Sequence, residues 1–224
     1  GGGNPDVIAA AQLAVKKTPA RLIAITMRRN SPLQAELATA GWPITHAFAT
    51  PTKKDGFLAT NSLLATIVLL TRAYETFAGR ATSLPATLND LLHPRVTRQT
   101  FLDQLRADTA AVLSRQTLIV LHGATTRPAA LDVESRFTEA ALASIQIADY
   151  RNFAHGRHYW LAQHGESSAV IAFSSAGDKV VRKTLSLLPS TIPQHQVIVG
   201  SCVDGALAAI CYSLLLAFIA GEIK

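Results

Sequence analysis

Short apolar runs alternate along this chain with segments whose apolar residues recur every three to four positions. The runs have the length and aliphatic character of buried strands, and the spacing of the other segments predicts helices. In the second half, strands are predicted over residues 117–121, 168–175 and 195–200, and helices over 127–144, 178–188 and 204–220. This alternation is typical of a parallel sheet covered by helices.

The first half shows the same rhythm but opens in a helix. Asn4-Pro5-Asp6 combines a capping residue, a proline for the first helical position and an acid for the first turn. A strand over 21–27, a helix from Ser31-Pro32 closing at Gly41, a strand over 45–50 and a helix over 57–74 follow. This order predicts a parallel sheet without its opening strand. Because the chain starts with glycines and not methionine, we expect it to be part of a longer polypeptide.

The domain organisation follows from a change of composition between the two halves. Residues 79–98 contain glycine, prolines and hydroxyl residues typical of a linker, and residues 100–113 form an amphipathic helix. We therefore predict a first lobe at 1–78, incomplete at its N-terminus, a linker with a bracing helix at 79–115, and a second lobe at 116–224. Ligands are expected at the carboxyl ends of the strands.

Composition limits the partners. With 49% apolar and 16% charged residues, the 224-residue chain has the profile of a folded globular protein. Its net charge of +6 favours anions, but the basic residues form no stripe with interleaved aromatics, so we expect no nucleic-acid partner. A phosphate on a small ligand would suit this charge equally well.

Cysteines and the apolar C-terminal run point to a cytoplasmic protein without a membrane partner. Cys202 and Cys211 make no disulfide framework, which favours a reducing cytoplasm. Cys202 has no obvious partner histidine in the sequence and Cys211 is expected to be buried, so we expect no nucleophilic thiol. The uncharged run over 205–221 is at the lower length limit for a membrane span. We predict a buried helix of an α/β protein there.

The segment from Asp132 to Gly156 carries the candidate chemistry. Seven residues of helix bring Asp132 and Glu139 almost onto one face, and His155 lies beyond in a turn. A carboxylate and an imidazole in one pocket can move a proton. Apolar neighbours from Phe137 to Leu142 would suit Glu139 to this role, although a solvated helix position is the alternative.

Basic groups crowd the same segment. Arg151, His155, Arg157 and His158 would repel one another without an anion, and phosphate is the natural candidate. The alternative is a surface patch of ion pairs with Asp149 or Glu166. No metal is expected, because Gly156 interrupts the histidines and no acid or cysteine cluster supports them. Tyr159 and Trp160 are predicted to be core or interface aromatics.

A glycine-rich turn at the start of the chain offers a second place for an anion. Gly1-Gly2-Gly3 runs into a helix N-terminus, where backbone N–H groups and the helix dipole favour negative charge. A flexible chain end is the alternative interpretation.

These motifs together resemble the sugar isomerase (SIS) family, in particular the isomerase half of glucosamine-6-phosphate synthase. The matching segments are RPAALD and SRFTE on the predicted helix, and AHG at His155, with the same 16-residue spacing from Glu139 to His155. The resemblance covers nearly the whole chain as architecture and two short motifs in detail. It implies two flavodoxin-like lobes, each a parallel sheet between helices in three layers.

The resemblance also implies roles for particular residues. Glu139 matches the base that moves a proton between C1 and C2 of the open-chain sugar, and His155 matches the histidine that assists ring opening across a dimer interface. Gly1 to Asn4 fall at the family's phosphate loop, and GFLAT (56–60) at its sugar pocket. The implied substrate-binding residues are Gly1, Gly2, Gly3, Asn4, Ser31, Leu58, Ala59, Thr60, Gly123, Asp132, Asn152 and Arg157.

Two functions follow from this comparison. The first is an aldose–ketose or deaminating isomerase that acts on a phosphosugar as a homodimer without a cofactor. The second is a non-catalytic phosphosugar sensor, which is favoured by departures from the family pattern. The phosphate loop has no serines, Asn152 and Arg157 replace a glutamate and a proline, and the family's catalytic lysine has no counterpart in this chain.

Overall fold

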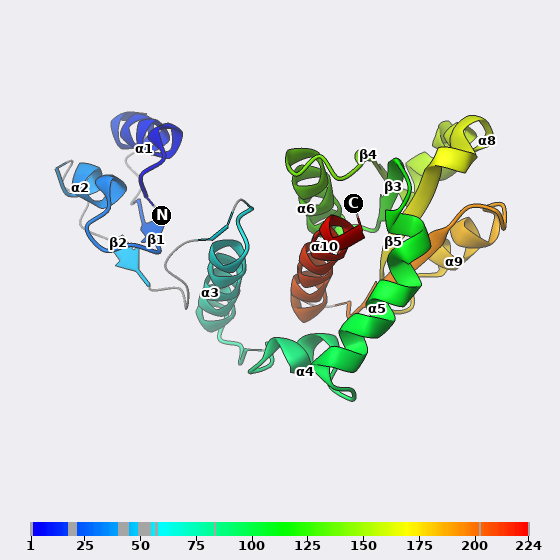
Figure 1. Cartoon of the computed structure of the whole chain (residues 1–224). Coiled ribbons are helices and arrows are strands. Elements are labelled where there is room, and N and C mark those ends of the chain that lie inside the picture. The colour runs from blue at the N-terminus through cyan, green and yellow to red at the C-terminus, as the bar shows by residue number, and fades with distance from the viewer. Residues whose placement is uncertain are drawn as a thin grey trace. The chain divides into compact units, whose positions relative to one another are not determined.

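Figure 1 shows a computed structural model of the chain, which describes residues 2–17, 22–39, 45–48, 55–56, 58–82, 84–201 and 203–223. The chain divides into two compact units, Gly1–Leu69 and Leu70–Lys224. The division falls inside one helix, α3 (Asn61–Phe77).

The first unit is built on a two-stranded parallel sheet. Its elements are α1 (Pro5–Lys17), β1 (Ala24–Thr26), α2 (Pro32–Thr39), β2 (Thr45–Ala47) and the start of α3 (Asn61–Phe77). Ala24 pairs with Thr45, and Thr26 with Ala47. Apolar side chains of α1 and α2 pack against β1, and this small core consists of Ala24, Leu33 and Leu37 with Ile8, Ala11, Val15 and Leu22 at its border.

The helix starts of this unit follow the capping residues. The Asn4 side chain accepts a hydrogen bond from the Asp6 amide at 2.8 Å, as the Asn-Pro-Asp motif predicts. At α3 the Asp55 carboxylate accepts from the amides of Asn61 and Ser62, so the helix begins later than predicted. Burial raises the pKa of Asp55, but hydrogen bonds from the Ser62 hydroxyl and from backbone amides outweigh it and leave the pKa lowered. The predicted helix end at Gly41 lies outside the described residues.

The second unit contains a four-stranded, all-parallel sheet in the order β4-β3-β5-β6. The strands are β3 (Thr117–His122), β4 (Ser144–Asp149), β5 (Ser168–Ser175) and β6 (Gln194–Val199). The strand order reverses at β3, as in flavodoxin-like sheets, which places a topological switch point between β3 and β5. The predicted α/β class with parallel sheets and flanking helices is confirmed.

Helices cover both faces of this sheet (Figure 1). One face carries α5 (Arg98–Leu113), α6 (Arg127–Glu139) and α10 (Val203–Ile223). The other face carries α7 (Tyr150–Asn152), the π-helix Phe153–Arg157, α8 (Tyr159–His164) and α9 (Lys179–Ser186). Alternate strand residues such as Ile119 and Leu121 face the second group. The result is a three-layer α-β-α arrangement.

Strand β4 is the main difference from the sequence prediction, which extended a helix to Ser144. Helix α6 ends at Glu139, and β4 begins at Ser144. Ala141 adopts a left-handed conformation with φ of 53°, and the Leu142 amide donates to the Phe137 carbonyl at 2.8 Å. This is the hydrogen bond that closes a helix end, but glycine normally occupies the left-handed position. Because alanine stands at this position, the end of the helix could not be predicted from the sequence.

The predicted linker and bracing helix belong structurally to the second unit. Residues 88–92 form a short helix, α4 (Leu88–Leu92), whose Thr87 cap accepts from the Asp90 amide at 3.2 Å. Helix α5 packs against β5, β6 and α10. The bracing helix is therefore one of the covering helices of this sheet.

Helix α10 is the long apolar helix at the C-terminal end. Among the described residues it is the one helix that is long and apolar enough to cross a membrane by length and composition. However, 56% of its most apolar 18-residue stretch is buried inside the unit. It packs against α6, α5, α4 and β6. At its start, Gly205 lies so close to the Gly200 carbonyl oxygen that a Cβ there would be 1.9 Å from it.

Candidate functional site

The first unit brings together four predicted binding residues at the carboxyl end of β1. Gly2 has a φ of 76°, and its carbonyl accepts a hydrogen bond from the Leu33 amide at 2.9 Å. A Cβ at Gly2 would lie 2.6 Å from the Ser31 hydroxyl, so Gly2 and Ser31 are in direct contact. Gly3 and Asn4 continue from this point into α1, while Gly1 lies outside the described residues. Residues almost thirty positions apart thus form one loop cluster.

The polar groups of this cluster already serve the helix ends. Ser31 is fully buried, and its hydroxyl accepts from the Gln34 amide at 3.3 Å. Asn4 caps α1. Gly3, by contrast, has no other heavy atom within 4 Å of where its Cβ would be. The space beside Gly3 is therefore open for a ligand at the N-terminus of α1.

The other predicted residues of the first unit precede α3. Leu58, Ala59 and Thr60 form the approach to this helix, and Ala59 is exposed. The Thr60 hydroxyl donates to the Asp55 carboxylate at 3.3 Å. Thr60 therefore belongs to the same hydrogen-bonded turn that starts α3.

Glu139 and His155 lie at opposite ends of the strands of the second sheet. Helix α6 starts just after the carboxyl end of β3 and runs back toward the amino ends of the strands, and Glu139 is its last residue. His155 comes six residues after β4 ends, on the side of the carboxyl ends of the strands. Glu139 is exposed to solvent, so the apolar setting predicted for it is not observed. A single chain does not bring this pair to one pocket.

Asp132 is held inside the unit by hydrogen bonds between helices. Its carboxylate accepts from the Arg136 guanidinium at 2.7 Å and from the Ser213 hydroxyl of α10. Arg136 is only 5% exposed. Asp132 therefore ties α6 to α10, an arrangement that accounts for its acidic side chain without a ligand.

His155 lies in the segment Phe153–Arg157, where two helical turns meet at a kink. The next residue, Gly156, has a φ of 148°, a conformation that residues with a side chain rarely adopt. This glycine lets the chain turn immediately after the histidine, as the His-Gly motif suggested.

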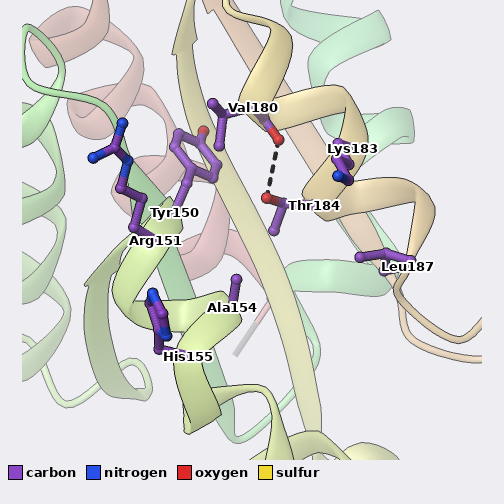
Figure 2. Close-up of a pocket in the computed structure, with 8 residues that line it drawn as sticks. All are labelled: Tyr150, Arg151, Ala154, His155, Val180, Lys183, Thr184 and Leu187. Carbon is purple, nitrogen blue, oxygen red and sulfur yellow. Dashed lines mark hydrogen bonds between the residues drawn. The ribbon is translucent and has the colours of Figure 1, made fainter.

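A cavity of about 340 Å³ opens beside His155. Figure 2 shows its two walls, one from α7 and the π-helix and the other from α9. The lining residues are Tyr150, Arg151, Ala154 and His155 on the first wall, and Val180, Lys183, Thr184 and Leu187 on the second. Within the described residues, three of these carry or can carry positive charge and none is acidic.

Both hydroxyl groups of the cavity donate hydrogen bonds to the backbone. Tyr150 donates to the Phe173 carbonyl at 2.8 Å, and Thr184 to the Val180 carbonyl at 2.9 Å (Figure 2 shows the second). Burial, with a smaller effect of the Asp178 charge, raises the pKa of Tyr150, so its proton stays in place. These side chains help to fix the walls.

The predicted basic cluster divides into two parts. Arg151 and His155 line the cavity, whereas Arg157 donates to the Ile147 carbonyl at 3.2 Å and the His158 ring bonds to the Phe153 carbonyl. The ion pairs described in the chain are Asp103–Arg106, Arg106–Glu222 and Asp132–Arg136, so no described pair joins this cluster to Asp149 or Glu166.

Asn152 and Asp149 have a structural task at the start of α7. The Asp149 carboxylate accepts from the amides of Arg151 and Asn152 at 2.9 Å each, and from the Asn152 side chain. The hydrogen bond from the Asn152 amide is the largest cause of a lowered Asp149 pKa. Asn152 therefore completes a helix cap.

Lys183 is the functional candidate that the sequence analysis missed. Val180, Lys183, Thr184 and Leu187 have the spacing that places residues on one face of a helix. This spacing was visible in the sequence, but only the fold shows that this face of α9 lies opposite His155.

Gly123 lies at the topological switch point of the second sheet. Its amide donates to the Thr126 hydroxyl at 3.0 Å, and Thr126 donates to the Phe173 carbonyl of β5 at 2.9 Å. The Thr125 hydroxyl lies 2.7 Å from that of Ser175. Thr126 thus joins the turn after β3 to strand β5, beside the switch point where ligands of such sheets bind.

The described residues form neither a metal site nor a reactive thiol site. No group of three or more histidine, cysteine or acidic side chains in these parts of the chain could hold a metal ion. Cys211 is buried, and burial raises the pKa of its thiol to about 12. Cys202 lies outside the described residues. Tyr159 is 64% exposed and so is not a core residue.

Comparison with known proteins identifies the fold. No protein-family model and no curated protein sequence matches the chain. Among solved structures, the C-terminal domain of glucosamine-fructose-6-phosphate aminotransferase from Francisella tularensis aligns with 100% of this chain at 16% identity and a TM-score of 0.71. Glucosamine-6-phosphate deaminase from Thermotoga maritima aligns with 99% at 16% identity and a TM-score of 0.65.

Tagatose-6-phosphate ketose/aldose isomerase from Escherichia coli gives the same TM-score, 0.65, over 99% of this chain at 17% identity. The chain spans 68%, 66% and 65% of the lengths of these three structures. At this identity the similarity establishes a fold. The resemblance to sugar isomerase proteins seen in the sequence is thus confirmed at the level of the fold.

Proposed function

We propose that this chain binds a phosphosugar and that the loop cluster of Gly2, Gly3, Asn4 and Ser31 holds the phosphate. The observation that carries this proposal is the contact between Gly2 and Ser31 at the carboxyl end of β1, beside the N-terminus of the 13-residue helix α1. Backbone N–H groups and the helix dipole there favour an anion, and the open space at Gly3 leaves room for one. The names of the structural neighbours supply the sugar phosphate class.

A charge change at Gly3 tests this site. Gly3→Asp places a carboxylate where the phosphate would lie, and we expect fructose 6-phosphate to bind at least about tenfold more weakly. Gly3→Asn has the same size without the charge and is the matched control. Isothermal titration with fructose 6-phosphate, and with fructose as the ligand without phosphate, measures both variants. Equal affinities of the two variants for the phosphosugar would contradict the proposed site.

We further propose that Glu139 of one copy of the chain and His155 of a second copy isomerise the bound sugar by two separate proton transfers. Starting from an aldose, the Glu139 carboxylate takes the proton from C2 while the C1 carbonyl oxygen gains a proton, which gives an enediol. The protonated Glu139 then returns its proton to C1 and the C2 hydroxyl loses its proton, so that a ketose forms without a cofactor. His155 moves the proton that opens the sugar ring. Support comes from the family resemblance and from the exposure of both side chains, which leaves them accessible to a second copy.

Glu139→Gln keeps the shape of the side chain but removes the base. We expect this variant to lose isomerisation while it binds fructose 6-phosphate with unchanged affinity. Turnover is followed by the appearance of the aldose, and binding by titration. Full activity of Glu139→Gln would refute the role of this residue.

A non-catalytic phosphosugar sensor is the second candidate, and one observation favours it. Glu139 and His155 lie at opposite ends of the strands, so a single chain has no assembled proton-transfer pair. Phosphosugars would then stabilise the protein against heat without being converted. A panel of sugar phosphates screened first by thermal shift and then for turnover separates the two functions.

A further inference from the structure

We propose that the cavity beside His155 is a second binding site, which takes a small organic anion with an apolar body. The proposed function uses only His155 from this cavity and places the phosphate of the sugar in the first unit, so Arg151, Lys183 and the apolar wall have no role in it. The inference rests on the charge, the apolar surface and the size of the cavity.

The charge of the cavity is positive and uncompensated among its described neighbours. Arg151 and His155 come from one wall and Lys183 from the other (Figure 2). The described hydrogen bonds and ion pairs do not engage these three side chains. Cations gathered around one cavity repel each other, and an anion between them removes that repulsion.

The nearby carboxylates are occupied elsewhere. Asp149 caps α7 through the amides of Arg151 and Asn152, and Asp178 caps α9 through the amide of Val180 at 3.0 Å. Neither lines the cavity. The two aspartates that precede its walls therefore hold the helix starts and do not close the site with an ion pair.

The remaining surface of the cavity is apolar. Val180 and Leu187 are 44% and 75% exposed, respectively, although both are large aliphatic side chains, and Ala154 lies opposite them. The hydroxyl protons of Tyr150 and Thr184 are already donated to backbone carbonyls. These two hydroxyls therefore have no proton left to donate to a sugar ring. An apolar body next to the anionic group suits this surface better, because it would cover Val180 and Leu187.

The size of the cavity sets an upper limit for the ligand. About 340 Å³ lies at the small end of the range for small-molecule sites. A benzene ring or a short aliphatic chain with one phosphate or carboxylate fits this range. Such a ligand would bridge the π-helix and α9, and it would lie against His155.

Three probes test the proposal: phenyl phosphate, inorganic phosphate and benzyl alcohol. We expect phenyl phosphate to bind more tightly than inorganic phosphate, and benzyl alcohol not to bind. Lys183→Ala should weaken phenyl phosphate binding about tenfold, since it removes a charge-assisted hydrogen bond. Lys179→Ala is the matched control, because Lys179 is an exposed lysine of the same helix that does not line the cavity. Leu187→Ala should weaken phenyl phosphate a few-fold and leave inorganic phosphate unchanged.

The outcome also separates this site from the phosphosugar site. Lys183→Ala should leave fructose 6-phosphate binding unchanged, and Gly3→Asp should leave phenyl phosphate binding unchanged. Loss of phenyl phosphate binding in Gly3→Asp, or equal effects of Lys183→Ala and Lys179→Ala, would overturn the second site. Equal affinity for phenyl phosphate and inorganic phosphate would overturn its apolar part. Failure of fructose 6-phosphate to bind at all would reject the proposed function and leave this test intact.

Discussion

At the scale of single residues, polar side chains that looked like ligand-binding groups serve the fold. Asp132 accepts hydrogen bonds from Arg136 and Ser213 between two helices, and Asn152 completes a cap with Asp149. Buried charges are stable only when they are paired and hydrogen-bonded. The chemistry that made these residues candidates in the sequence is the chemistry that packing needs here.

The Asp132–Arg136 pair gives a prediction at this scale. Asp132→Ala should lower the free energy of unfolding by about 3–5 kcal/mol, because it leaves the buried Arg136 guanidinium without its carboxylate. The double variant Asp132→Leu with Arg136→Met should recover much of this loss. Urea unfolding measures all three proteins.

An exposed pair on another helix provides the control. Asp103 and Arg106 form an ion pair at 3.3 Å with a 59% exposed Asp103 side chain. Asp103→Ala should change stability by no more than about 1 kcal/mol. If Asp132→Ala were as mild as Asp103→Ala, the buried pair would not be holding α6 to α10.

At the scale of the element, close backbone contacts determine how the long helix α10 begins. The Gly200 carbonyl approaches Gly205 so closely that no side chain fits between them. This contact joins the turn after β6 to the first turn of α10. It places the helix where it can pack against α6 and α5.

Two glycines of α10 provide a matched pair for a test. Gly205→Ala should destabilise the protein by about 1–3 kcal/mol or more, since the added Cβ would meet the Gly200 carbonyl oxygen. Gly221→Ala, with no heavy atom within 4 Å of the new Cβ, should be neutral or stabilising by up to about 1 kcal/mol. Thermal unfolding of both variants measures the difference. A stable Gly205→Ala protein would contradict the close contact.

At the scale of the whole molecule, the arrangement of the second sheet separates Glu139 from His155. Because α6 runs antiparallel to the strands, its last residue lies near their amino ends. The turn after β4 lies at the carboxyl ends. A catalytic reaction that uses both residues therefore needs two copies of the chain. This requirement makes the proposed isomerase testable by mixing variants.

The prediction concerns the mixture of Glu139→Gln and His155→Ala. Each variant alone should be inactive, but mixed dimers contain one site with both native residues. After unfolding and refolding together, the mixture should regain about a quarter of the native activity by random pairing. Separately refolded proteins combined at the end, without exchange, are the control. Absence of recovery in demonstrably mixed dimers would contradict pairing across copies.

Much of the fold could be predicted from the sequence, because periodicity and capping act locally. Asn4 at the start of α1, Asp178 at the start of α9 and the apolar run of β5 are examples. Strand β4 was missed because Ala141 ends α6 in a conformation that glycine usually takes. The role of Lys183 was missed because its helical spacing does not reveal what the helix faces.

The sequence by itself determined the α/β class, the order of most elements and the basic character around His155. These features depend on side chains close together in the chain. The tertiary structure alone decided which groups meet: Gly2 with Ser31, Asp132 with Ser213, and Lys183 opposite His155. It also decided that Glu139 and His155 do not meet in one chain. Such contacts depend on strand order and helix direction, which sequence spacing does not specify.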